Sequence, residues 1–195
     1  MEDNDLLGWA RLTNGNNEII LVTNFGKALR FSEKVIRPTG RSAGGISGIH
    51  LDDNDKVASM EVIEEKGDLM LVTTLGYGKR TPLSEYPSKG RATRGVQSIT
   101  KGSESRLGPI AAARVVQEGD DVTLISSGGM VLRMKVKDVK QSGRATRGVR
   151  LMGVKEGDRV ASIARTAKAE LKKAGADING SPSPKPGEQI DLPLR

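Results

Sequence analysis

Short apolar runs separated by turns recur along most of the chain, and their composition is that of β-strands. In three places an apolar run rich in branched side chains precedes a glycine-containing turn and a second run that carries an arginine. Branched residues favour strands, and two such runs joined by a short glycine turn predict a hairpin. The paired runs are EIILVT (18–23) with ALRF (28–31), DLMLVTT (68–74) with KRTPL (79–83), and DVTLISS (121–127) with VLRMKV (131–136).

Two further apolar stretches follow each hairpin and predict a third and a fourth strand. The third stretches are GISGIHL (45–51), GVQSI (95–99) and GVRLM (148–152). The fourth stretches are KVASMEV (56–62), IAAARVV (110–116) and RVASIA (159–164), and Leu6 to Leu12 resembles the fourth strand of a preceding unit. Helical periodicity is confined to 164–174, and the polar sequence beyond it, rich in Pro, Gly and Ser, predicts a disordered tail.

The strands belong to a repeated unit of about 50 residues. The string GRATRGV occurs at 90–96 and again at 143–149, and a looser copy, GRSAGGI, occurs at 40–46. Fourteen residues before the first glycine of each copy lies another glycine, and four residues after that glycine lies an arginine. These glycines are Gly26, Gly76 and Gly129, and the arginines are Arg30, Arg80 and Arg133. Glycine at such places permits sharp turns with a positive φ.

Four short strands in each unit predict an all-β, propeller-like fold. We expect a β-pinwheel with about three four-stranded blades and a disordered C-terminal tail. The divisions are the end of a preceding blade at 1–15, one blade each at 16–62, 63–116 and 117–165, and a short helical, then disordered tail at 166–195.

Positive charge is concentrated at one place in each unit. The chain has a formal net charge of +7, whereas the windows 26–44, 76–95 and 128–148 alone carry +4, +4 and +5. A charge repeated at one point of every blade recurs around the assembled disc, so the windows predict a curved basic rim. Lysine and arginine bind duplex DNA by releasing counterions from its phosphates, and a curved track favours bent DNA.

Composition argues against several other kinds of site. The chain has no cysteine and a single histidine, His50, which leaves no thiolate or histidine metal site. No GxxxxGK[ST] loop occurs, and LDDNDK (51–56) lacks the rest of a calcium loop, so an acidic turn between strands is the better interpretation. We therefore expect no catalytic residue, no metal and no cofactor. Without a long apolar run or a signal sequence, a cytoplasmic protein without membrane contact is expected.

The units resemble the blades of the C-terminal domain of the bacterial DNA gyrase A protein, in the type IIA topoisomerase family. The resemblance extends over roughly residues 6–165 and rests on three stretches. They are GKALRFSEKVIRPTGRSAGGISGIHL (26–51), GYGKRTPLSEYPSKGRATRGV (76–96) and SGGMVLRMKVKDVKQSGRATRGVRLMGVKEGDRVASIAR (127–165). The family's Gln-Arg-Arg-Gly-Gly-Lys-Gly box does not occur, and SKGRATRG (88–95) occupies the equivalent place on its own blade.

The resemblance implies a disc of blades that exchange strands and whose basic rim wraps duplex DNA, with weak sequence preference. It also implies partners, the gyrase catalytic core and the gyrase B subunit, which perform ATP-dependent negative supercoiling of the bacterial nucleoid. The residues implied to contact DNA are Lys27, Arg30, Arg37, Arg41, Lys79, Arg80, Lys89, Arg91, Arg94, Arg133, Lys135, Arg144 and Arg147.

Two other interpretations stay open at this point. The corresponding domain of the topoisomerase IV A protein uses the same blades in smaller number to select substrate topology. A propeller-like protein-interaction module would have basic windows that do not share one face, and its binding would survive high salt.

Overall fold

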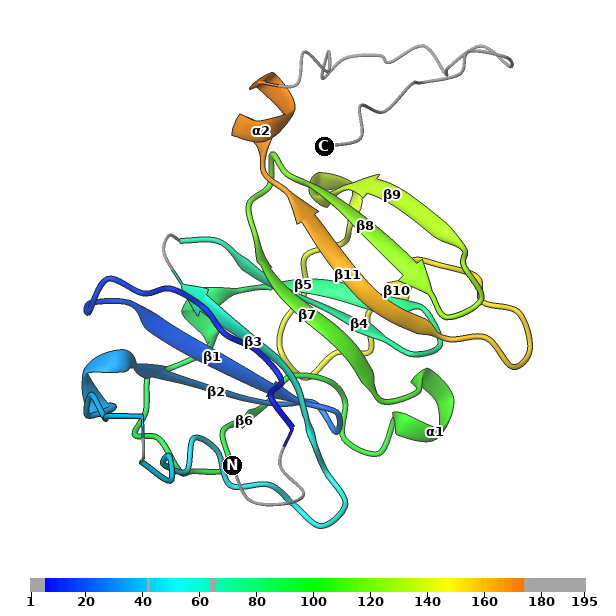
Figure 1. Cartoon of the computed structure of the whole chain (residues 1–195). Helices are drawn as coiled ribbons and strands as arrows, with labels where there is room; N and C mark the ends of the chain where they lie inside the picture. The colour runs from blue at the N-terminus through cyan, green and yellow to red at the C-terminus, as the bar shows by residue number, and fades with distance from the viewer. Residues whose placement is uncertain (1–5, 42, 64–65, 174–195) are drawn as a thin grey trace.

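The computed structural model describes residues 6–41, 43–63 and 66–173, which form three antiparallel sheets placed side by side (Figure 1). In Figure 1 the first sheet lies at lower left, the second in the middle and the third at upper right. The strands carry almost all of the regular structure in this part of the chain. The all-β fold class is therefore confirmed.

The three predicted hairpins are present. They pair β1 (Glu18–Thr23) with β2 (Lys27–Ser32), β4 (Asp68–Thr73) with β5 (Tyr77–Pro82), and β8 (Asp121–Ser126) with β9 (Val131–Lys135). The repeated turn glycines Gly26, Gly76 and Gly129 have φ values of 79°, 80° and 84°, a conformation that a side chain disfavours. A short 3₁₀ helix follows each hairpin, at Glu33–Val35 (η1), Leu83–Glu85 (η2) and Val136–Asp138 (η3).

Each unit keeps its fourth strand, and the second and third units each give their third strand to the preceding unit. The fourth strands pair with the first strand of their own hairpin, and they are β3 (Val57–Ile63), β7 (Ile110–Val116) and β11 (Val160–Thr166). The third strands pair with the preceding hairpin, β6 (Val96–Gln97) with β2 and β10 (Val149–Arg150) with β5. Strand exchange between neighbouring units, as the resemblance implied, is thus present twice.

The third sheet has one strand fewer than predicted. Its order is β11-β8-β9, whereas the first two sheets are β3-β1-β2-β6 and β10-β5-β4-β7. No later unit within the described residues supplies a strand to β9, so the edge of β9 is open. Val131 on this edge is 63% exposed.

Two apolar clusters hold the three sheets together. Leu69 and Leu71 of β4 lie in a cluster with β1 residues, whereas Met70 and Val72 lie in a second cluster with β8 residues. All six residues of β4 are buried. A strand covered on both faces needs apolar residues at successive positions, which explains the uninterrupted run LMLV.

Three predicted elements differ from the structure. Residues 6–12 form no strand, with Leu6 93% and Leu12 96% exposed, because they pair with no sheet edge in the described part of the chain. Residues 45–51 form only an isolated bridge between Ile49 and Thr93, because β2 already pairs with β6 and no other hairpin edge in the described ranges receives them. The helix predicted at 164–174 is α2 (Lys168–Lys173), because β11 continues to Thr166.

The remaining helical segment was not predicted. It is α1 (Glu104–Leu107), a single turn between β6 and β7. No helix in the described ranges is long and apolar enough to cross a membrane. The predicted tail beyond residue 173 lies outside the described residues.

Candidate nucleic-acid interface

Two loops with the sequence GRATRG project where neighbouring units exchange strands. We call residues 89–95 and 142–148 the GR loops. Each begins where a backbone amide donates to the arginine carbonyl of the preceding hairpin, Lys89 N to Arg30 O (2.8 Å) and Ser142 N to Arg80 O (2.9 Å). Each ends at the exchanged strand, β6 on β2 or β10 on β5. The loops are therefore anchored at both ends and occupy equivalent places on neighbouring sheets.

The last glycine of each GR loop is required by the backbone. Gly95 and Gly148 have φ values of 68° and 76°. A Cβ atom would lie 2.4 Å from Ala28 O at Gly95 and 2.5 Å from Gly78 O at Gly148, which is too close for any side chain. The first glycine differs, since Gly90 has open space around it and does not have a positive φ.

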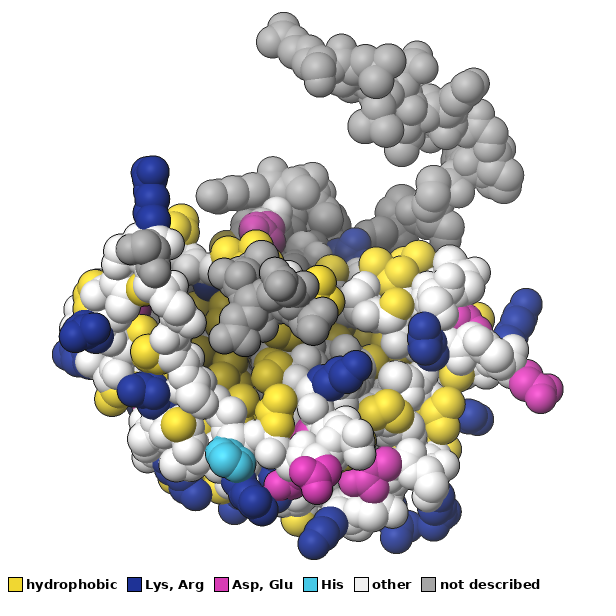
Figure 2. Space-filling view, turned by 60° about the horizontal axis from the view of Figure 1, so that its bottom comes forward, with side chains coloured by type: hydrophobic (Ala, Val, Ile, Leu, Met, Phe, Trp, Pro, Cys, Tyr) yellow, Lys and Arg dark blue, Asp and Glu magenta, His cyan; other side chains and the backbone are white. Residues whose placement is uncertain are grey.

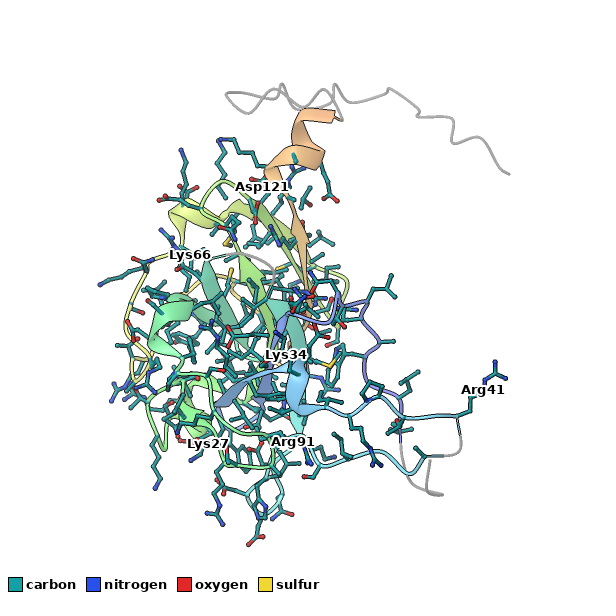
Figure 3. All side chains as sticks on the ribbon, turned by 90° about the vertical axis from the view of Figure 1, so that its left-hand side faces the viewer. Lys27, Lys34, Arg41, Lys66, Arg91 and Asp121 are labelled. Atoms are coloured by element: carbon teal, nitrogen blue, oxygen red, sulfur yellow. The ribbon has the colours of Figure 1, made fainter. Side chains whose placement is uncertain are left out.

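Four of the predicted DNA-contact residues are exposed and form no ion pair within the described ranges. They are Arg37, Arg41, Lys89 and Arg147. Arg41 lies on a loop that projects away from the sheets (Figure 3). Figure 2 shows lysine and arginine side chains at the margin of one face and also within it, with a group of acidic side chains among them.

A second group of predicted residues surrounds an aspartate. Lys27 Nζ lies 4.0 Å and Arg94 Nη1 3.3 Å from the Asp52 carboxylate, and Arg91 donates to the carbonyl of Ser47 (3.0 Å). Exposed ion pairs contribute little free energy, and the Arg94 side chain remains 67% exposed. A phosphate can therefore replace Asp52 as its partner. The predicted residues Lys135 and Arg144 are half-buried.

The repeated arginine of each hairpin has a structural partner on the preceding strand. In every unit an acidic residue lies 12 positions earlier and accepts from the guanidinium across the hairpin. The pairs are Arg30 with Glu18 (Nε to Oε2, 2.9 Å), Arg80 with Asp68 (Nη1 to Oδ2, 2.8 Å) and Arg133 with Asp121 (Nε to Oδ2, 2.9 Å). The arginine lowers the pKa of the Glu18 carboxyl by this hydrogen bond.

Two of these arginines also join one unit to the next. Arg30 Nη1 donates to Leu83 O (2.9 Å) and Tyr86 O (3.3 Å), and Arg80 Nε donates to Val139 O (2.8 Å). Arg80 is only 9% exposed, so the prediction that it lies on an open rim is wrong. Arg30 is half-buried in the same arrangement. Arg133 has no following unit among the described residues, and its side chain is 54% exposed.

The prediction that Lys79 lies on an exposed rim is also wrong. Lys79 is 1% exposed, and its ammonium donates to Gly143 O (2.7 Å), Arg144 O and Thr146 Oγ1 (3.2 Å) inside the second GR loop. Burial lowers the pKa of Lys79 from 10.5 to about 8, with Glu85 opposing this change and Arg144 adding to it. A charge that cannot reach solvent cannot contact a phosphate directly.

The pKa of Lys79 predicts a rise in stability at alkaline pH. Between about pH 8 and 10.5 the unfolded chain still binds this proton whereas the folded chain has released it, so the free energy of unfolding increases with pH. The expected gain is about 3 kcal/mol. Urea unfolding at pH 7 and pH 10.5, compared between the wild type and Lys79→Leu, measures this difference because other titrations cancel. Parallel pH profiles for the two proteins would contradict the burial cost.

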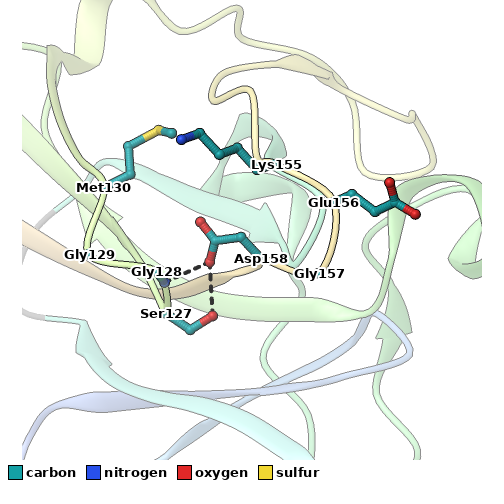
Figure 4. Close-up of a pocket in the computed structure, with 8 residues that line it drawn as sticks. All are labelled: Ser127, Gly128, Gly129, Met130, Lys155, Glu156, Gly157 and Asp158. Carbon is teal, nitrogen blue, oxygen red and sulfur yellow. Dashed lines mark hydrogen bonds between the residues drawn. The ribbon is translucent and has the colours of Figure 1, made fainter.

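The acidic turns between strands hold hairpins together. Asp55 accepts from the amides of Phe25 (3.0 Å) and Lys56 (2.8 Å). Asp158, at the equivalent place in the third unit, accepts from Ser126 Oγ (2.6 Å), Ser127 Oγ (2.9 Å) and Gly128 N (2.7 Å), as Figure 4 shows for Ser127 and Gly128. The Ser126 hydrogen bond, with those from backbone amides, lowers the pKa of Asp158 to about 2.

The hollow beside Asp158 is therefore formed by a turn. The Asp158 carboxylate already accepts hydrogen bonds from Ser127 and Gly128 there. The hollow lies between residues 127–130 and 155–158 (Figure 4). No cluster of three or more His, Cys, Asp or Glu side chains able to hold a metal occurs in the described ranges.

Two exposed lysines beside the second GR loop were not predicted. Lys140 lies two residues before the loop begins at Ser142. Lys101 follows Thr100, whose hydroxyl donates to Ala145 O in the loop (3.0 Å). Lys140 lies in the basic window 128–148, whereas Lys101 lies outside every window, so the charge pattern carried no signal for it.

Comparison with known proteins agrees with this architecture. The family model described as "DNA gyrase C-terminal domain, beta-propeller" matches residues 17–64, 67–108 and 120–167, one segment for each hairpin. The DNA gyrase A protein of Mycobacterium tuberculosis (strain ATCC 25618 / H37Rv) is 36% identical over 183 residues, which cover 93% of this chain and 22% of that protein. The DNA gyrase A protein of Salmonella typhimurium (strain LT2) is 39% identical over 181 residues, covering 93% and 20%.

Solved structures show the same likeness. A DNA gyrase A C-terminal domain superposes with a TM-score of 0.73 and 26% identity, covering 77% of this chain and 50% of that chain. The C-terminal domain of a DNA topoisomerase IV gives 0.76 and 30%, covering 85% and 52%. This chain spans about a fifth of the length of the curated relatives named above. Because the family model matches most of the chain, segment by segment with its sheets, this protein belongs to the DNA gyrase C-terminal domain family.

Proposed function

We propose that this chain binds and wraps duplex DNA through the phosphate backbone, as a wrapping module of a gyrase A-type protein. The observation that carries the proposal is the pair of GR loops, which present arginines from equivalent places on neighbouring sheets. Contacts repeated along a row of sheets suit the regular charge ladder of DNA and require no base reading.

The contact residues follow from exposure. Lys89, Arg91, Arg94, Arg144 and Arg147 of the GR loops contact phosphates, and Arg37 and Arg41 extend the track from the first unit. Lys27 and Lys135 lie at its margin. Lys79, Arg80 and Arg30 support the loops and sheets from within, and Arg133 lies at the open edge.

The proposed role within a complete gyrase rests on the similarity to the DNA gyrase A proteins named above. A chain of this family would present wrapped DNA to a breakage-reunion core and gyrase B subunit, so that ATP-driven strand passage introduces negative supercoils in nucleoid DNA. A plasmid assay tests the wrapping step alone. Nicked plasmid is ligated with the protein bound, and wrapping should shift the linking-number distribution in one direction.

The topoisomerase IV likeness supports a second candidate function. The match to that domain covers 85% of this chain at a TM-score of 0.76. A module of that type would recognise DNA crossings without constraining a writhe of fixed sign. In the plasmid assay it would bind DNA and leave the linking-number distribution centred.

Removal of the arginines from the first GR loop should weaken binding for every DNA sequence alike. Each lost phosphate contact costs about eightfold at 0.1 M salt by counterion release, so Arg91→Ala with Arg94→Ala should reduce affinity about 60-fold. Fluorescence anisotropy with two unrelated duplexes of about 40 base pairs measures the change.

The matched control for this double variant is Lys155→Ala with Arg159→Ala. It removes the same charge at exposed positions outside the GR loops. An equal loss of affinity in both double variants would show that total charge, and not the loop, governs binding.

A further inference from the structure

The two GR loops share the string GRATRG, yet their backbones differ within it. Ala92 in the first loop has a φ of 57°, whereas Ala145, its equivalent, does not have a positive φ. In the first loop Arg91 and Ala92 donate to the carbonyls of Ser47 and Gly48. An identical string cannot by itself select two conformations, so the surroundings of the loops must select them.

The second loop is held by polar side chains of the preceding unit. Lys79 donates to Gly143 O and Arg144 O, Thr81 Oγ1 donates to Ser142 O (2.9 Å), and Glu85 Oε2 accepts from Arg144 N (3.0 Å). Thr100 adds its hydrogen bond to Ala145 O from the other side. Five consecutive residues, 142–146, therefore each have at least one partner here.

The first loop has no such side-chain support from the preceding hairpin and is held instead by the backbone of residues 47–50, where Ala92 N donates to Gly48 O (2.7 Å) and His50 N donates to Thr93 O (3.0 Å). The positions equivalent to Lys79, Thr81 and Glu85 are occupied by Leu29, Phe31 and Val35, 50 residues earlier. These side chains have no polar atom and cannot bind backbone groups. The difference in loop conformation thus has a physical cause outside the loops.

Lys79 is not needed for the sheet itself. Its equivalents are Leu29 and Leu132, and Leu29 is 1% exposed in the same kind of site. Burying an ammonium costs free energy that leucine avoids, and the three acceptors in the loop match its three N–H donors. The lysine therefore acts on the loop. Its hydrogen bonds also hold the carbonyl oxygens of Gly143 and Arg144, which would repel a phosphate, toward the protein.

We propose that Lys79 and Glu85 are positioning residues that fix the second GR loop in one conformation for phosphate binding, whereas the first loop is held by residues 47–50 and does not depend on them. This inference rests on the proposed function. A fixed loop loses less conformational freedom on binding, so Arg144 and Arg147 gain more from each contact than they would in a loop without Lys79 and Glu85.

A double-mutant cycle tests the proposal with the full chain and a duplex of about 40 base pairs. Lys79→Leu, which places in the second sheet the residue found in the other two, should reduce affinity about tenfold. In the Lys79→Leu background, Arg144→Ala with Arg147→Ala should have a much smaller effect than in the wild type. Arg91→Ala with Arg94→Ala should have the same effect in both backgrounds.

Two further measurements separate positioning from a merely structural role. Glu85 is exposed, so Glu85→Ala should fold normally and still show the same selective coupling to Arg144 and Arg147. The affinity of the wild type should fall as pH rises from 7 to 9 and Lys79 loses its proton, with Glu85 and Arg144 the charged groups that face it. Lys79→Leu should show no such fall.

Independent, multiplicative effects of Lys79→Leu and the Arg144 and Arg147 changes would overturn the positioning role. If the wild type binds DNA and both Lys79→Leu and Glu85→Ala bind it with unchanged affinity, the positioning role is also overturned. By contrast, a wild-type chain that does not bind duplex DNA at low salt would remove the proposed function itself.

Discussion

Raising the salt concentration from 50 to 200 mM should weaken the binding of duplex DNA about 500-fold. The five GR-loop cations, Lys89, Arg91, Arg94, Arg144 and Arg147, would each release nearly one counterion, which gives a log–log slope of about −4.5, and contacts by Arg37 and Arg41 would steepen it further. Fluorescence anisotropy across this range of salt measures the slope directly. This loss of affinity exceeds the loss expected from any pair of substitutions, because salt weakens every phosphate contact at once.

Two comparisons make the salt experiment decisive. The Arg91→Ala and Arg94→Ala double variant should have a slope smaller by about 2 units, since two contacts are missing. Duplexes of unrelated sequence should give the same slope as each other. A flat titration would instead favour a protein-interaction module, whose binding depends little on counterions.

The buried arginine of the second hairpin should be far more important for stability than its exposed equivalent in the third. Arg80 and Asp68 pair at 2.8 Å with side chains only 11% and 10% exposed. Arg80→Met would leave the Asp68 carboxylate buried beside Gln141 alone and also remove the bond to Val139 O. Breaking such a buried pair costs about 3–5 kcal/mol.

Arg133→Met is the matched control because the pair Arg133–Asp121 has the same spacing and register but a 54% exposed arginine. An exposed pair contributes about 0–1 kcal/mol. Urea unfolding of both variants should therefore give very different midpoints with similar slopes. Equal losses would mean that the contact between units adds nothing to Arg80.

The strands of this fold could be predicted from the sequence because the pattern of apolar and polar residues depends on how many faces of a strand are covered. The run at 69–72 is apolar at every position since both faces of β4 are covered, whereas Val122 and Leu124 of β8 alternate with half-buried residues. Repetition then located the hairpins, because the turns at Gly26, Gly76 and Gly129 all have a positive φ, which glycine adopts most readily.

Charge proved harder to interpret than strand composition. The basic windows predicted that Arg80 and Lys79 are exposed, because the net charge of a window does not show which of its cations are paired or buried. For the arginines a usable signal existed, since Glu18, Asp68 and Asp121 each lie 12 residues before an arginine, on the opposite strand of a hairpin. For Lys79 the leucines at the equivalent positions 29 and 132 indicated a buried site, whereas its partners, 64 to 67 residues away, left no signal.

The unpaired edge of β9 gives the row of sheets a polarity. Within the described ranges the outer edge of β9 has no paired strand, and residues 45–51 follow a Gly-Arg segment without joining a sheet. These two ends are unlike, so a further unit that paired with β9 would attach in one orientation, as in a heterologous contact. A unit of the same kind would bring one more Gly-Arg segment beside the open edge.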